Sequence, residues 1–249
     1  RLLSTADATG VTAELNVSAA LSFKGASTAD VSGSAASNTS VAARAIATGI
    51  EGDGGKDKIR NSGNITLMDQ DTGVDEVDAS ALGVSASLNV SGNVAIKGVA
   101  AGDVTGTAAS NATVLAEAEA TGIDGGGDND DIANSGIIKL LPSSSADGIA
   151  ASLNVSGNMV GESEGSSMSD AGATALSTAI GIDGGEGNDI ISNEGAIILM
   201  KQELGEDEVD AKAIGVAASL DITGNLNGSS EGQALSKAIT TAGAEATGI

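Results

Sequence analysis

One stretch of sequence occurs three times without gaps, as Gly49–Leu67, Gly122–Leu140 and Gly181–Leu199. Each copy runs from a Gly-Ile pair, through a loop rich in Gly and Asp, into a segment whose matching residues lie two positions apart. A period of two indicates a strand with one constrained face, whereas a helix would constrain positions three and four apart. We therefore predict parallel strands stacked so that equivalent residues form columns. The expected columns are Ile59, Ile132 and Ile191; Asn61, Asn134 and Asn193; Gly63, Gly136 and Gly195; Ile65, Ile138 and Ile197; and Leu67, Leu140 and Leu199.

The asparagine on the constrained face has two interpretations. A buried amide needs hydrogen-bond partners, and stacked copies would supply them as an amide ladder. Alternatively, Asn-x-Gly suits a bend, in which an asparagine before glycine tolerates a left-handed backbone. The sequence leaves both interpretations open.

A second string, small-x-small-x-Gly-apolar, occurs eight times along the chain and divides each repeat into two halves. Three of its copies, with their glycines at Gly49, Gly122 and Gly181, lead into the Gly/Asp loop, and four, with their glycines at Gly10, Gly83, Gly148 and Gly215, lead toward strings such as Leu88-Asn89-Val90-Ser91. The leucines of this second kind, Leu15, Leu88, Leu153 and Leu220, are 73, 65 and 67 residues apart. We predict an all-β parallel β-helix (β-solenoid) of about 67-residue repeats, each of two coils with about three short strands per coil.

In this prediction, small residues such as Ala45, Ala47, Ala118 and Ala120 line a tight corner, and Leu and Ile fill the middle. A helical alternative exists, since Ala112–Ala120, Ala171–Ile180 and Gln233–Ala246 are rich in alanine. We assign these three segments to strands, because their Ala-x-Ala alternation leads directly into Gly-Ile.

Composition supports thin repeated layers rather than one thick core, and it limits the function. Phe23 is the single aromatic residue, and the chain has neither His nor Cys. The sequence therefore offers no His or Cys as a base or nucleophile, and its carboxylates recur with the repeats instead of forming one unique site, so we predict that the protein is not an enzyme. The net charge of −23 makes nucleic acid a poor partner. No apolar run is long enough for a membrane span.

Residues 1–249 form a single repeat array, which we expect to be a segment of a longer protein, because the sequence starts at Arg1 without an initiator Met. Both ends fall inside a repeat. An uncapped solenoid edge can pair with another chain. We therefore expect either further repeats or end-to-end or lateral association of the protein with itself.

The Gly/Asp loop carries a family resemblance. Gly184-Gly185-Glu186-Gly187-Asn188-Asp189-Ile190-Ile191-Ser192 resembles the nonapeptide of repeats-in-toxin proteins, and Gly52–Arg60 and Gly125–Ala133 resemble it with Asp53 and Asp128 in place of glycines. The continuation into Asn-x-Gly-x-Ile is similar to repeats of bacterial autotransporter and haemagglutinin-type adhesins. The resemblance implies an extracellular or cell-surface bacterial protein.

The same resemblance implies Ca²⁺ bound by Asp57, Asp130 and Asp189 together with loop carbonyls. Its other possible ligands are Asp53, Asp124, Asp128, Asp131, Asp183 and Glu186. Nonapeptides of that family follow one another in tandem, whereas here a whole repeat separates them. The alternative is a tight turn with solvated carboxylates.

Two functions remain. In the first, the solenoid is a structural protein that forms a stalk, fibre or surface sheath. In the second, it is a calcium-dependent adhesin that holds a surface or a carbohydrate through its acidic loops, Asp69–Asp78 and Glu203–Asp210.

Overall fold

The computed structural model describes residues 4–22, 30–67, 77–95, 102–158, 161–199 and 209–249, and in these ranges the chain forms strands and no helix. Eight strands are long: β1 (Ser4–Ser22), β2 (Val31–Glu51), β5 (Val77–Ala95), β6 (Val104–Asp124), β9 (Pro142–Asn158), β10 (Gly161–Asp183), β13 (Asp210–Asn225) and β14 (Gly228–Thr247). Six are short: β3 (Lys58–Asn61), β4 (Ile65–Leu67), β7 (Asp131–Asn134), β8 (Ile137–Leu140), β11 (Ile190–Asn193) and β12 (Ala196–Ile198).

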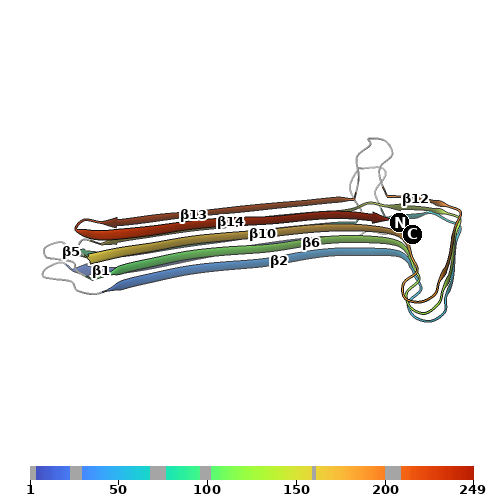
Figure 1. Ribbon diagram of the computed structural model, residues 1–249, viewed down its shortest axis with the longest axis horizontal. Coiled ribbons are helices and arrows are strands. Elements are labelled where there is room, and N and C mark those ends of the chain that lie inside the picture. Colours follow the sequence, from blue (N-terminus) through green and yellow to red (C-terminus); the bar gives the residue numbers. More distant parts are fainter. Residues whose placement is uncertain (1–3, 23–29, 68–76, 96–101, 159–160, 200–208) are drawn as a thin grey trace.

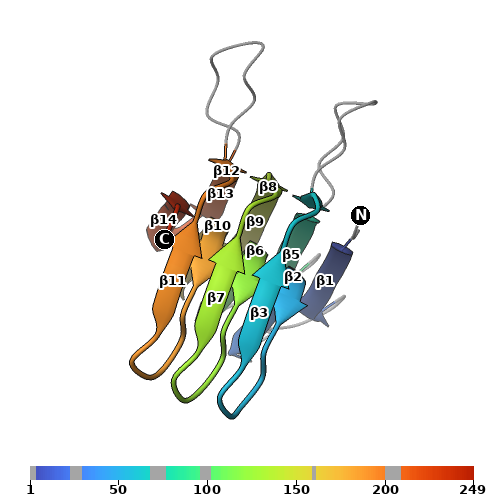
Figure 2. The ribbon, with the colours of Figure 1, turned by 90° about the vertical axis from the view of Figure 1, so that its right-hand side faces the viewer.

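The strands form four parallel sheets. Two sheets contain the long strands, in the orders β1-β5-β9-β13 and β14-β10-β6-β2, and two contain the short strands, in the orders β11-β7-β3 and β12-β8-β4. The two long sheets lie face to face and form a two-layered slab, and the short sheets lie at one end of it (Figure 1). Figure 2 shows this end, with the equivalent strands of successive coils arranged in a row. The prediction of an all-β solenoid with parallel, in-register stacking is confirmed.

The number of coils per repeat differs from the prediction. Leu15 pairs with Leu88, Leu88 with Leu153 and Leu153 with Leu220, so the chain returns to the same place only after a full repeat. The two halves of a repeat occupy different sheets. Each repeat is therefore one wide coil, with two long strands and two short ones. The halves resemble one another because both are long strands that cross the same thin interior, which requires small inward residues in each.

The apolar interior lies in the half of the slab next to the short sheets. Ala79, Ala118 and Ala120 from the long strands pack with Ile132 and Ile138 from the short strands, and all are at most 2% exposed. The predicted alanine corner is thus wrong: Ala45, Ala47 and their equivalents point inward from the flat strands β2 and β6. The assignment of the alanine-rich segments to strands is confirmed in β6, β10 and β14.

The far half of the slab has a polar interior. Along β5, Ser85, Ser87, Asn89 and Ser91 are buried, whereas Leu88 and Val90 between them point to the outside. This reverses the expectation that leucine fills the middle throughout. The inward residues instead form hydrogen bonds across the slab, as Ser87 does with Ser110 at 2.9 Å between their hydroxyl oxygens.

Two columns of glycine provide the room that the larger inward residues need. A Cβ atom on Gly106 would lie only 2.7 Å from the Ser91 hydroxyl and 2.8 Å from the Asn89 amide nitrogen. A Cβ atom on Gly83 would lie 2.6 Å from a methyl carbon of Val114 on the facing strand. The paired strands place Gly10, Gly83, Gly148 and Gly215 above one another, as the sequence predicts.

Candidate functional site

The three Gly/Asp loops stack directly on one another at the end of β2, β6 and β10 (Figure 2). Two isolated bridges, Gly54 with Gly127 and Gly127 with Glu186, join the loops. Asp53 and Asp128 adopt left-handed backbone conformations, with φ angles of 65° and 73°, where the sequence places aspartate in the position of a glycine. These are conformations that Asp tolerates better than most side chains.

Asp57, Asp130 and Asp189 form a column that runs through the loops. The Asp57 backbone N–H donates to Asp130 Oδ1 at 2.8 Å, and the Asp130 N–H donates to Asp189 Oδ1 at 2.9 Å. The carboxylates of Asp130 and Asp189 therefore each hold the backbone of the preceding coil. Their second oxygens lie beside the glycines that open the loops, and a Cβ on Gly125 would lie 2.9 Å from Asp130 Oδ2.

The second carboxylate oxygens of this column are the feature that bears on a bound cation. Asp57 Oδ2 and Asp130 Oδ2 are buried, and neither has a hydrogen-bond partner among the described residues. Asp130 is only 2% exposed. Stacked strands place such carboxylates about 4.8 Å apart, so their negative charges repel one another.

The other predicted ligands lie elsewhere in the loop. Asp124 Oδ1 and Asp183 Oδ1 each accept the N–H of the residue two positions on, Gly126 and Gly185, at 2.9 Å. Asp128, Asp183 and Glu186 are exposed. Among the residues that the structure describes, no three Asp or Glu side chains converge as a metal-holding group. A Ca²⁺ ion, which takes six to eight oxygens, would thus depend on Asp57, Asp130 and Asp189 together with loop carbonyls.

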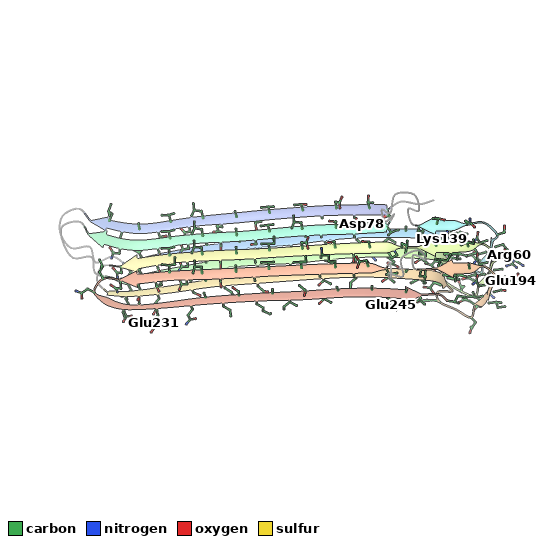
Figure 3. All side chains as sticks on the ribbon, turned by 90° about the horizontal axis from the view of Figure 1, so that it is seen from above. Arg60, Asp78, Lys139, Glu194, Glu231 and Glu245 are labelled. Atoms are coloured by element: carbon green, nitrogen blue, oxygen red, sulfur yellow. The ribbon has the colours of Figure 1, made fainter. Side chains whose placement is uncertain are left out.

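Asp131 belongs to an exposed ion-pair cluster. Arg60 donates to both of its carboxylate oxygens, at 3.3 and 3.0 Å, and Lys58 lies 3.5 Å away. The hydrogen bond from Arg60 holds the pKa of Asp131 below its ordinary value, and the same contact raises the pKa of Arg60. Figure 3 places Arg60 at the short-sheet end of the slab, together with Lys139 and Glu194.

Two columns of amides run across the stack. Asn61 donates to Asn134, and Asn134 to Asn193, each at 2.7 Å. The same side chains accept the N–H of the glycine two residues on, at 3.1 Å for Gly63 and 3.2 Å for Gly136. The ladder and the bend, which the sequence presents as alternatives, therefore coexist.

A second amide column, in the polar half, was not expected from the sequence. Asn89 donates to Asn154 at 2.8 Å and Asn154 donates to Asp221 at 2.7 Å, with both asparagines completely buried. Its signal was the recurring Leu-Asn-Val-Ser string, in which Asn and Ser alternate with apolar residues. Either alternate set could have faced inward on pattern alone.

The outward side of sheet β1-β5-β9-β13, which we call the Leu/Val face, was also missed. Four neighbouring rows of its outward residues are apolar across all four strands. The Leu row contains Leu15, Leu88, Leu153 and Leu220, and the adjacent Ala row contains Ala13, Ala86, Ala151 and Ala218. The rows that flank these two begin at Val11 and Val17 and contain only Val and Ile.

Comparisons with known proteins identify no relatives: no protein-family model, curated protein or solved structure matches this chain. No helix that could cross a membrane is found in the described part of the chain. The predicted acidic loops lie outside the described residues, except for Val77 and Asp78, which begin β5, and Val209 and Asp210. Pro142–Ser145 begins β9, the strand of the middle repeat that pairs with β5.

Proposed function

We propose that this protein is a structural repeat protein, extracellular or on the cell surface, that forms a stalk, fibre or sheath by coil stacking and end-to-end assembly. The supporting observation is that the rows of equivalent residues run through every coil, including the first and the last strand of each long sheet. Gly10 of β1 occupies the row of Gly215 in β13, and Gly33 of β2 that of Gly232 in β14.

The edges of the stack provide the means of assembly. β1 and β13 are the outer strands of one long sheet, and β2 and β14 are those of the other. The outer strand of a parallel sheet presents unpaired N–H and C=O groups that another strand can use. Because the rows of β1 recur in β13, the β13 edge of one copy offers the β1 edge of another the same pairing that β5 offers within the chain.

Electron microscopy of the purified full chain tests this proposal. We expect unbranched filaments that lengthen with protein concentration. Particles that remain single and short at high concentration would rule out end-to-end assembly by this chain.

A second candidate function, a calcium-dependent adhesin, is supported by the unpartnered buried oxygens of Asp57 and Asp130. In this proposal Ca²⁺ supplies positive charge between stacked carboxylates, while the chain orients Oδ2 through the bond that Oδ1 makes to the neighbouring backbone. Calcium titration followed by thermal unfolding tests it. We expect the melting temperature to rise with Ca²⁺ and to fall with chelator, and the Asp130→Asn variant to lose this response. A melting temperature independent of Ca²⁺ would remove this candidate.

A further inference from the structure

The Leu/Val face carries large apolar side chains that are most exposed on its edge strands β1 and β13 and half-buried on most of the inner strands β5 and β9. Val11 is 67% exposed, Leu15 65%, Leu220 55% and Ile222 51%. The Leu row, the Ala row and the two flanking rows contain no charged or polar residue. A continuous apolar patch of this extent on a protein surface marks a site of association.

The outward side of sheet β14-β10-β6-β2, which we call the mixed face, shows that stacking alone does not produce such rows. One of its rows reads Arg44, Glu117, Leu176 and Gly243 across the four strands. Equivalent positions therefore vary freely on the mixed face, even though the backbone pairing is as regular there. The repetition of similar apolar residues along the Leu row, the Ala row and the two flanking rows points to a partner that contacts every coil in the same way.

The shape of the Leu/Val face is complementary to the same face of a second copy of the chain. The Leu row stands as a ridge, and the Ala row beside it forms the floor of a shallow groove of about 550 Å³ that crosses all four strands. A two-fold axis parallel to the rows and midway between these two places the Leu row of each copy on the Ala row of the other. Each strand then faces its own counterpart, as a self-complementary interface requires.

The rows farther from this axis match as well. The row of Val11 meets the row of Val17, so that residues of similar size oppose one another. The next row out contains Leu82 and Ile214, and it meets a row in which Gly92, Gly157 and Gly224 leave space. Asp147 is the one acidic residue in the Leu82 row, and its Oδ1 is buried without a hydrogen-bond partner among the described residues.

The size of the face is sufficient for a specific complex. Four strands about 4.8 Å apart span about 19 Å, and the residues from Thr9 to Leu21 extend about 40 Å along a strand. The footprint is therefore about 760 Å² on each copy, close to the roughly 800 Å² per partner of a standard interface.

We propose that two copies of this chain associate face to face through the Leu/Val face, with the Leu row of each seated on the Ala row of the other. This inference rests on the proposed self-assembly and specifies its lateral contact. It is independent of the strand edges, so lateral pairing and end-to-end growth are separable by experiment.

Sedimentation of the full chain over a range of concentrations tests the lateral contact. The wild type is expected to form dimers or paired filaments, whereas a variant with Leu88→Lys and Leu153→Lys should dissociate into monomers or single filaments. The matched control is Met168→Lys with Leu235→Lys on the mixed face, where the side chains are 50% and 62% exposed. This control should sediment like the wild type.

Cross-linking gives a readout that does not depend on charged substitutions. The chain has no cysteine, so Ala86→Cys introduces a single thiol close to the proposed axis. A short bismaleimide should link two Ala86→Cys chains, and should not link Ala109→Cys chains, whose thiol lies on the mixed face.

Several results would overturn the inference. One is a wild type that stays monomeric at every concentration. Another is a Leu88→Lys/Leu153→Lys variant whose filaments are as wide as those of the wild type. This result would exclude the lateral contact and leave end-to-end assembly intact. A third is a monomer that binds phosphatidylcholine vesicles or cellulose through this face, since a different partner would then occupy it. Discrete dimers without filaments would support the lateral contact and contradict end-to-end growth.

Discussion

The two halves of the slab interior are held together by different forces. Next to the short sheets, Ala79 and Ala118 pack with Ile132 and Ile138 in an apolar core. In the far half, Ser87 and Asn89 bond across the layers and along the stack. The same strands β5 and β6 pass through both halves, so one backbone arrangement supports a core of either kind. In-register stacking gives each inward amide or hydroxyl a repeated neighbour, and it can therefore replace apolar burial.

The largest effect is expected in the apolar half. Ile138 is completely buried, and Ile138→Ala should reduce the free energy of unfolding by about 2–5 kcal/mol, through lost burial and the cavity that remains. Urea unfolding followed by circular dichroism measures it. Ile190→Ala is the matched control, because Ile190 lies in the short strand β11 and is 68% exposed. Equal losses in the two variants would contradict an apolar core at this end.

In the polar half, Asn154→Ala should cost about 2–3 kcal/mol, because it leaves Asn89 Nδ2 without an acceptor and removes the donor to Asp221. Asn154→Leu should be no more stable than Asn154→Ala, since the same partners stay unpaired. Asn111→Ala on the mixed face serves as the control, with an expected change within about 0.5 kcal/mol. If Asn154→Leu proved stabilising, the polar half would depend on burial rather than on hydrogen bonds.

The two layers lie close together in the polar half, and we expect a smaller loss of stability when an inward glycine is replaced there. Gly106→Ala should destabilise the protein by about 1–3 kcal/mol, because the new methyl group meets Ser91 and Asn89. Gly92→Ala should be almost neutral, since the nearest atom to its Cβ would be the Gly157 carbonyl oxygen at 3.5 Å. Thermal unfolding of the pair compares them directly. Tolerance of both substitutions would show that the layers lie farther apart in this half.

The smallest effect concerns pH. Burial raises the pKa of Asp78, with a further contribution from the charge of Asp7, while a hydrogen bond to Ser143 opposes the rise. The folded state therefore holds this proton to a higher pH than the unfolded state does. Between the unfolded pKa of about 4 and the raised pKa, the stability contribution of Asp78 falls as pH increases. Asp78→Asn should remove this dependence and slightly stabilise the protein at neutral pH.

The pKa of Asp131 is shifted in the opposite direction to that of Asp78. The hydrogen bond from Arg60 lowers its pKa, so its contribution is present above the unfolded pKa and is lost as pH falls through the lowered value. Asp131→Asn should therefore weaken the protein slightly at neutral pH. Unfolding curves of both variants, measured across the pH range in which carboxyl groups titrate, check these assignments. The assignments would be contradicted if the two substitutions changed the stability at neutral pH in the same direction.

The sequence predicted the columns of the short strands correctly. The Ile59, Ile132 and Ile191 column and the Asn61, Asn134 and Asn193 column occur as expected, because a period of two combined with exact repetition specifies both the strand and its neighbour. The spacing of Leu15, Leu88, Leu153 and Leu220 also equals the pairing offset of the strands.

The sequence could not determine how the two halves of a repeat lie relative to one another. Gly83 and Gly122 occur in similar strings, yet they lie in different sheets, because a shared need for small inward residues produces the same pattern as stacking. Nor could the alternation in Leu88-Asn89-Val90-Ser91 identify the inward face. That choice follows from Gly106 and its equivalents on the facing sheet, which are remote in sequence and open space for an amide. The Ca²⁺ ligation of Asp57, Asp130 and Asp189 stays a prediction.

The central claim is that one full repeat makes one coil, and engineered disulfides test it most directly. Ser80 and Ser145 are directly paired on the outward side of β5 and β9, and neighbouring strands bring Cα atoms within the range that a disulfide spans. Glu119 occupies the position equivalent to Ser80 in the other half of the repeat, but it lies on the mixed face. We predict that mild oxidation closes an intramolecular disulfide in the Ser80→Cys/Ser145→Cys variant and none in the Ser80→Cys/Glu119→Cys variant. A disulfide in the second variant and not in the first would contradict this fold.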